Sequence, residues 1–251
     1  MSESSRLPMF YTMVASLDRE AHASLRLDTK GGFAFAKGTN CLSLSLSELG
    51  AASVHYPIVF SGGDGLPMPT AIVGYRDSEN LLVEADGGWS PGAYIPCCLR
   101  VYPFVFIETA PGLDNLALGV EARSPLLSES EGEALFDSGN PTPLLQEKLS
   151  LADALRRDID ATRAFAEALA AADVLVPEQA TLDFISGGTH RLVGFRGIDP
   201  ARFGALPEPL VFDWWQKGYL EACYAILHSQ FRWGDLLRRA EQWEKLQSLP
   251  A

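Results

Sequence analysis

The stretch that decides the fold of this chain runs from residue 55 to residue 106. It contains the segments HYPIVF (55–60), AIVGYR (71–76), NLLV (80–83) and AYIPCCLRVYPFVF (93–106). Apolar runs of this length, separated by glycine, proline and polar residues, are typical of β-strands joined by turns. The stretch therefore predicts a β-sheet in the N-terminal half of the chain.

Four elements are predicted within this stretch. Pro57–Phe60 predicts a buried strand, because proline is tolerated at the first residue of a strand. Thr70–Tyr75 and Leu81–Glu84 flank a polar turn, which favours a β-hairpin. Tyr102–Ile107 predicts one more strand.

Short strands and turns are also expected on both sides of the stretch. Residues 9–46 contain two apolar segments, Phe33–Ala36 and the alternating Leu42–Leu46, which predict strands. Ser47–Ser53 predicts one or two helical turns. Leu116–Glu121 predicts a strand that is followed by a long loop.

A long helix is predicted after Pro143, with Ser150 as its N-cap and Asp153 three residues further on. One apolar stripe follows at helical spacing, formed by Leu151, Leu155, Ile159, Thr162, Phe165 and Leu169.

The C-terminal part alternates between strand and helix signals. Thr181–Phe195 predicts a second hairpin around a Ser-Gly-Gly turn. Asp199-Pro200 predicts the start of a short helix, since proline suits the first helical turn. Phe212–Phe231 and Trp233–Leu249 predict two further helices.

Together these elements predict an α+β protein. We expect a mostly antiparallel sheet region over residues 1–145. A helical region with one hairpin, over residues 146–251, is expected to pack on it and form one compact unit with it.

The composition and charge of the chain argue against some classes of function. The chain has 251 residues and a net charge of −12, which argues against binding to nucleic acid or anionic membranes, because both need a basic surface. No apolar run reaches transmembrane length and no secretory signal is visible, so a cytoplasmic protein is expected. The four cysteines, Cys41, Cys97, Cys98 and Cys223, are expected to be reduced thiols.

Arg100 is the first candidate for a functional residue, because it lies in a nearly uncharged neighbourhood. A guanidinium group stays charged and needs a carboxylate, carbonyl oxygens or an aromatic face. One interpretation is that Arg100 fastens this segment to the sheet. The other is that it faces a pocket with Trp89, Tyr94 and Tyr102 and binds an anionic or planar ligand.

Familiar catalytic motifs are missing from the sequence, which contains no Walker A, Rossmann, H-E-x-x-H or G-x-S-x-G pattern. The four histidines have no short metal-ligand spacing. The alternative to a binding protein is an enzyme in which His22, His55 or His228 meets distant carboxylates at a metal site. Each histidine, His190 included, has the alternative of an ordinary hydrogen-bonded position.

Aromatic residues are frequent between residues 212 and 231. A helix face packed on the sheet explains most of them. Trp214 and Trp215 are adjacent and point about 100° apart on a helix. One of the two is therefore a candidate for an exposed contact with a partner.

Several segments outside 55–106 occur in a characteristic order. They are Glu20–His22, Leu25–Arg26, Leu135–Phe136, Gly139–Pro143, Thr162 with Phe165, Leu192–Phe195, Ile198–Asp199 and Tyr224–Gln230. In this order, over nearly the whole chain, the sequence resembles the SapC-like family of bacterial proteins.

The resemblance implies a role but no catalytic residue. Genes of this family often lie near those of TonB-dependent receptors and halogenase-like enzymes, which implies a protein or peptide partner. The chain departs from the family pattern at Arg100-Val101, where two adjacent arginines are usual, and Glu121 represents the expected acidic residue. The favoured hypothesis is a non-catalytic binding or accessory protein, able to form oligomers. A surface-layer component, as the family name implies, is a further alternative.

Overall fold

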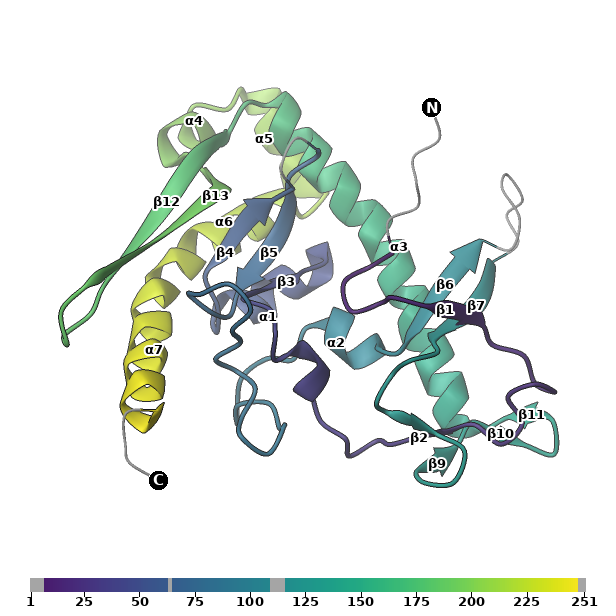
Figure 1. The fold of residues 1–251 in the computed structure, drawn as a ribbon. Helices are drawn as coiled ribbons and strands as arrows, with labels where there is room; N and C mark the ends of the chain where they lie inside the picture. The colour runs from purple at the N-terminus through teal and green to yellow at the C-terminus, as the bar shows by residue number, and fades with distance from the viewer. Residues whose placement is uncertain (1–6, 63–64, 109–115, 248–251) are drawn as a thin grey trace. The chain divides into compact units, whose positions relative to one another are not determined.

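The computed structural model of the chain describes residues 7–62, 65–108 and 116–247 and confirms the α+β class (Figure 1). Close contacts divide the chain into two compact units whose segments alternate along the sequence. The first unit comprises residues 1–36, 85–88 and 99–157, and the second comprises residues 37–84, 89–98 and 158–251. The expected division at residue 145 stays a prediction.

The first unit contains three small antiparallel sheets. One has the strand order β1-β7-β6, with β1 at Val14–Ser16, β7 at Leu116–Glu121 and β6 at Phe104–Glu108. The second has the order β8-β2-β9, with β8 at Leu127–Ser128, β2 at Arg26–Leu27 and β9 at Glu133–Ala134. The third is the hairpin of β10 (Phe136–Asp137) and β11 (Asn140–Pro141). The strands predicted at Leu116–Glu121 and near Phe104 are confirmed.

The core of the first unit lies between its sheets and the start of α3 (Pro143–Ala171). Pro143 is the first residue of this helix, and Thr142 Oγ1 accepts a hydrogen bond from Leu145 N. The prediction that Ser150 caps the helix is therefore wrong: its hydroxyl lies within α3 and donates to Gln146 O. The buried core residues are Leu27, Val101, Phe104, Leu118, Val120, Leu135, Leu145 and Ala152.

The segment Phe33–Ala36 is not a strand, so that prediction is wrong. Residues Ala34–Ala36 form the 3₁₀ helix η1, closed by the bond from Ala36 N to Phe33 O. The turn before it needs glycine at position 32, where φ is +69° and a Cβ atom would lie 2.4 Å from Gly87 O. This tight turn bends the chain before it can pair as a strand.

A buried carboxylate fastens the N-terminal segment of the first unit to β7. Glu121 is only 1% exposed, and its oxygens accept hydrogen bonds from Thr12 N, Met13 N (2.9 Å) and Arg123 N (3.2 Å). The Thr12 hydroxyl donates a further bond of 3.0 Å. Desolvation by itself would raise the pKa of Glu121, but the backbone hydrogen bonds outweigh it and lower the pKa.

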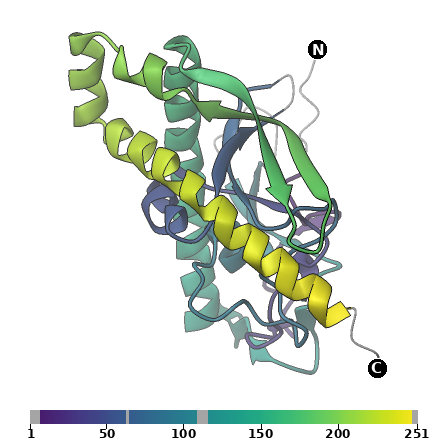
Figure 2. The same cartoon turned by 90° about the vertical axis from the view of Figure 1, so that its left-hand side faces the viewer.

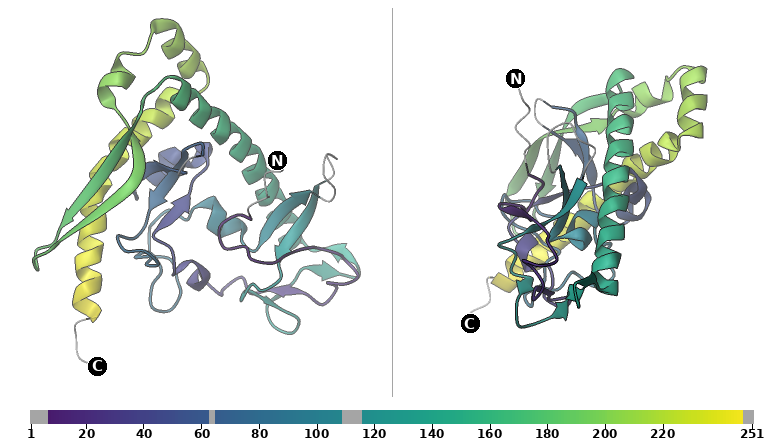
Figure 3. Two further views of the ribbon diagram at one scale, coloured as in Figure 1. Left: turned by 45° about the horizontal axis from the view of Figure 1, so that its top comes forward. Right: turned by 90° about the vertical axis from the view of Figure 1, so that its right-hand side faces the viewer.

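The second unit is built on a five-stranded antiparallel sheet with the order β12-β13-β4-β5-β3. The predicted buried strand after Pro57 and the predicted second hairpin are both confirmed. Figure 3 shows the hairpin of β12 and β13 extending beside α7. The strands are β3 at Cys41–Ser43, β4 at Ile58–Ser61, β5 at Met68–Ile72, β12 at Leu175–Asp183 and β13 at Thr189–Ile198.

The predicted hairpin of Thr70–Tyr75 with Leu81–Glu84 is wrong. β5 ends at Ile72 and pairs with β3 on one edge and β4 on the other, so no edge is left for a further strand. The second segment makes a backbone bond to the first, from Leu81 N to Val73 O. Its other backbone contacts go to the residues that follow it: Leu82 O accepts from Ser90 N, and Val83 forms a bridge with Trp89.

Helices complete the second unit. The short helix predicted after Asp199 is confirmed, because the Asp199 side chain accepts bonds from the first two N–H groups of α4. The helix predicted over Phe212–Phe231 is interrupted at Gly218, whose φ of +73° is incompatible with a continuous helix. Figure 2 shows α6 and α7 following one another along one line. The bounds are η2 Leu46–Glu48, α1 Leu49–Ser53, α4 Pro200–Gly204, α5 Glu208–Gln216, α6 Tyr219–Ser229, η3 Gln230–Arg232 and α7 Trp233–Gln247.

The apolar stripe of α3 is divided between the two units. Leu151 and Leu155 pack on the core of the first unit, whereas Phe165 and Leu169 are buried in the second. Thr162 has a polar function within the stripe, because its hydroxyl accepts a bond from Leu46 N (2.7 Å) and donates to Asp158 O (2.5 Å).

Replacing Glu121 by glutamine will weaken the acid dependence of stability. Because the folded-state pKa lies below the ordinary value of 4.5, the carboxylate stabilises the fold above that pH, and the contribution is lost as the pH falls through the folded pKa. Glu121→Gln should lower the free energy of unfolding by about 1–3 kcal/mol at pH 7 and flatten its loss in acid. Urea denaturation at several pH values measures the free energy of unfolding and its dependence on pH, and the exposed Glu129→Gln is the control. If the variant loses stability in acid as steeply as the wild type, Glu121 is not the group responsible.

Thr162→Val will destabilise the second unit, because it keeps the shape of the side chain but leaves Leu46 N without its acceptor. We expect a loss of about 1–3 kcal/mol in the free energy of unfolding. Thr162→Ser retains the hydroxyl and should lose less. A smaller loss for Thr162→Val than for Thr162→Ser in denaturant titrations would show that packing of the methyl group, not the hydrogen bond, is what matters.

Candidate ligand-binding site

The first unit contains a cavity of about 950 Å³. Its walls come from the loop after β2, from β9, from α2 (Cys97–Val101) and from the first turns of α3. Its volume lies in the upper part of the range that is usual for sites of small ligands. The polar and aromatic lining residues are Asp28, Thr29, Lys30, Phe33, Phe35, Arg100, Tyr102, Glu133, Glu147, Lys148 and Ser150.

Aromatic rings form one wall of this cavity. The rings of Phe35 and Tyr102 are stacked, with centroids 4.1 Å apart and planes inclined by 20°. Phe10 and Tyr11 pack edge-on against Tyr102, and the Tyr11 hydroxyl donates to Phe104 O. Burial raises the pKa of Tyr102, so its phenol is neutral at physiological pH. This wall is therefore flat, apolar and uncharged.

Two cationic residues line the helical side of the cavity. Arg100 is exposed near the end of α2, and the Lys148 ammonium on α3 donates a 3.1 Å hydrogen bond to the Arg100 carbonyl oxygen. This bond holds the Lys148 charge next to the residue that carries the guanidinium. Such a pair of cations is suited to an anionic group on a ligand.

Two carboxylates line the strand side of the cavity. Glu133 lies opposite Leu27 in the pairing of β2 with β9, so it is next to Asp28, which directly follows Leu27. The Thr29 hydroxyl donates to Glu133 (2.6 Å) and Lys30 N donates to Asp28 (2.9 Å). These bonds fix both carboxylates at the turn that lines the cavity.

The four residues predicted to form one pocket lie in different units. Arg100 and Tyr102 belong to the first unit and line its cavity, whereas Trp89 and Tyr94 belong to the second. A single pocket made of all four residues stays a prediction. Sequence reasoning missed Phe35, Lys148 and the acidic pair, because these residues come from segments that only the strand and helix contacts bring together.

In the second unit, Trp89 and Tyr94 take part in a buried network around Glu48. The Trp89 indole N–H donates to Tyr94 O (3.0 Å) and to the Tyr56 hydroxyl (3.2 Å). The Tyr94 hydroxyl donates to Glu48 (3.0 Å), which is 4% exposed and also accepts bonds from Ser45 and Cys97 N. Four donors thereby satisfy a buried carboxylate, which is what burial of this group requires.

The histidines do not assemble into a metal site within the described residues. His22 lies in the first unit, where its Nδ1 bonds to the backbone of Asp18, and His55 and His228 lie in the second. Burial lowers the pKa of His55, and Arg239 and Arg232 contribute to the same effect. Throughout residues 7–62, 65–108 and 116–247, no group of three or more His, Cys, Asp or Glu residues is placed to hold a metal ion. The four cysteines are free thiols.

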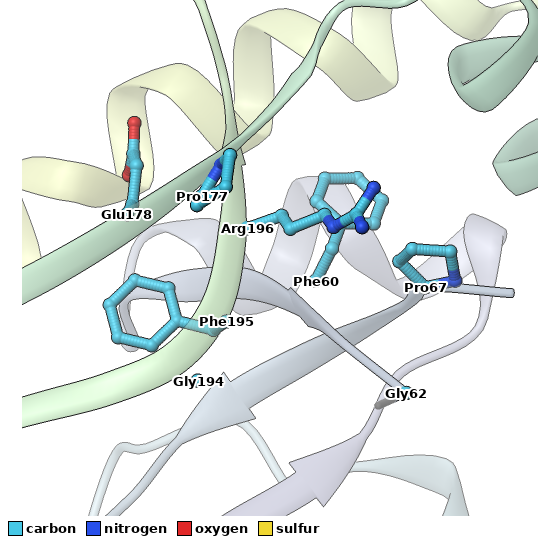
Figure 4. Close-up of a pocket in the computed structure, with 8 residues that line it drawn as sticks. All are labelled: Phe60, Gly62, Pro67, Pro177, Glu178, Gly194, Phe195 and Arg196. Atoms are coloured by element: carbon cyan, nitrogen blue, oxygen red, sulfur yellow. The ribbon is translucent and has the colours of Figure 1, made fainter. Parts of the chain in front are cut away.

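A second, smaller cavity of about 210 Å³ lies in the second unit, where β13 meets β4 (Figure 4). Gly194, with φ at +88°, belongs to a β-bulge opposite Glu178–Ala180. Figure 4 shows Arg196 reaching toward Phe60 and Pro67. The cavity is smaller than typical ligand sites and has a single cation, so the cavity of the first unit is the better candidate.

Exposed aromatic residues mark another surface of the second unit. Trp214 is 1% exposed and Trp215 is 65% exposed, which confirms that one of the adjacent tryptophans faces outward. Three other aromatic residues of this region are exposed as well, namely Phe212, Tyr224 and Phe231. In the part of the chain that the structure describes, no helix has both the length and the apolar character needed to cross a bilayer.

The fold and the cavity define an α+β protein with a polar, aromatic-walled candidate ligand site. The sequence model of the SapC family matches residues 17–236, which is most of the chain, and the chain therefore belongs to the SapC family. This confirms the resemblance seen in the sequence. No curated protein and no solved structure matches the chain.

Tyr94→Phe will separate a structural role of this residue from a binding role. The change removes one donor from the buried Glu48 carboxylate and should lower the free energy of unfolding by about 1–3 kcal/mol. Tyr224→Phe, at an exposed site, should have almost no effect in the same denaturation assay. A Tyr94→Phe protein of unchanged stability that has lost a ligand would instead place Tyr94 in the binding site.

Proposed function

We propose that this protein is a non-catalytic binding protein, which takes a small carboxylate-bearing ligand with a planar or apolar body into the cavity of its first unit. The observation that carries the proposal is that Arg100 and Lys148 line the same cavity as the stacked rings of Phe35 and Tyr102. The cations supply charge-assisted hydrogen bonds to a carboxylate, and the rings supply an apolar surface for the rest of the ligand.

Several observations support binding rather than catalysis. A nucleophile needs a base within hydrogen-bond reach, or a lowered pKa. Burial instead raises the pKa of Cys223 to about 12 and also raises the pKa of Cys41. Among the residues that line the cavity, Ser150 donates its hydroxyl hydrogen to Gln146 O, a backbone carbonyl that cannot act as a base.

An accessory role toward a TonB-dependent receptor or a halogenase-like enzyme is part of this proposal. The protein would then deliver a bound small molecule to such a partner, or signal to the partner that the molecule is present. The exposed aromatic residues of α5 and α6 are suited to a protein contact, because large aromatic side chains are enriched at interfaces.

Arg100→Ala should weaken ligand binding while leaving the fold intact, because the Arg100 side chain is exposed and lines the cavity. With 3-phenylpropionate as the probe, calorimetry should show about 10- to 100-fold weaker binding, the usual effect of losing a hydrogen bond to a charged group. Arg123→Ala, an exposed arginine that does not line the cavity, is the matched control. If Arg100→Ala unfolds the protein, Arg100 fastens the segment to the sheet instead.

Native mass spectrometry with metal analysis, on protein purified from its own host, tests the class of function. A retained organic acid or peptide would support the proposal. A stoichiometric metal ion would favour the alternative of an enzyme with a histidine site, and large homo-oligomers would favour a surface-layer component.

A further inference from the structure

Each side of the cavity in the first unit has an excess of one sign of charge. The helices α2 and α3 contribute Arg100 and Lys148, which a hydrogen bond holds close together. The turn after β2 and the strand β9 contribute Asp28 and Glu133, which the strand register holds close together. Glu147 on α3 and Lys30 in the turn after β2 carry the opposite sign, so the helical side has a net charge of +1 and the strand side has a net charge of −1.

The two further charged residues of the lining leave this cavity without net charge. Lys30 and Glu147 are exposed, and with them three cations and three carboxylates line the site. A ligand that carried only a carboxylate would be attracted by Arg100 and repelled by the acidic pair. A ligand with both charges would be attracted at both sides.

We infer that the ligand of this cavity is a zwitterion of the size of a short peptide, with its carboxylate at Arg100 and Lys148 and its ammonium group at Asp28 and Glu133. This inference rests on the proposed function and names the class of its ligand. The carboxylates accept hydrogen bonds from an ammonium group, just as the cations donate them to a carboxylate.

The size and the walls of the cavity fit a short peptide better than a free amino acid. A volume of about 950 Å³ exceeds what one residue fills. The neutral rings of Phe33, Phe35 and Tyr102 offer a surface for an apolar side chain between the two charged ends.

The test compares three forms of one dipeptide by calorimetry: alanyl-phenylalanine, its N-acetyl derivative and its C-terminal amide. N-acetylation removes the positive charge and should weaken binding to the wild-type protein by about tenfold or more. The Asp28→Asn, Glu133→Gln double variant should bind the free and the acetylated peptide almost equally. Both substitutions keep an acceptor for the local hydrogen bonds, and Glu129→Gln with Asp137→Asn is the control pair of surface carboxylates.

The outcomes separate this inference from the proposed function. If the free and acetylated peptides bind equally well and both depend on Arg100, the zwitterion is overturned and the carboxylate-binding function stands. If the peptides and 3-phenylpropionate all fail to bind, both proposals fall. If the double variant is less stable than the wild type, the single variant Asp28→Asn replaces it in the test. The inference would be contradicted if N-acetylation weakened binding to Asp28→Asn as much as it weakens binding to the wild type.

Discussion

The buried carboxylate of Glu121 is the interaction on which the candidate site depends. It binds the backbone of Thr12 and Met13 and so fixes a segment more than a hundred residues away in sequence. This places β1 against β7 and brings Tyr11 against Tyr102. A buried charge is costly unless donors surround it. The segment is therefore held where its N–H groups reach the Glu121 carboxylate. In this position Tyr11 packs against Tyr102, which belongs to the aromatic wall of the cavity.

Glu48 gives the second unit a comparable centre. Its carboxylate joins the helical turn after β3 to the loop that contains Tyr94 and to Cys97, the first residue of α2. The loop has almost no strand pairing of its own, and side-chain hydrogen bonds hold it in place. Trp89 and Tyr94 are aromatic residues of the kind that bind ligands, but here their polar atoms are used inside the protein. An aromatic side chain that binds a ligand and one that bonds inside the protein are distinguished only by the atoms that they contact.

Strand order explains where the local patterns failed. The segment Leu81–Glu84 is as apolar as a strand, yet both edges of β5 are occupied, so it has no place beside β5 in the sheet. The stripe of α3 is correct as a pattern, but it serves two cores in succession. Ser150 has the residue type of an N-cap, but the helix is capped by Thr142, eight residues earlier, and begins at Pro143.

The sequence is enough to predict the α+β class, most of the strands and helices, the family, and two of the cavity residues, Arg100 and Tyr102. Those features depend on local periodicity, on turn residues and on the order of segments, all of which can be read along the chain. The tertiary structure alone decided that Lys148, Asp28 and Glu133 share a cavity with Arg100. These residues are brought together by strand register and by one hydrogen bond between helices, and no local pattern records such contacts between distant segments.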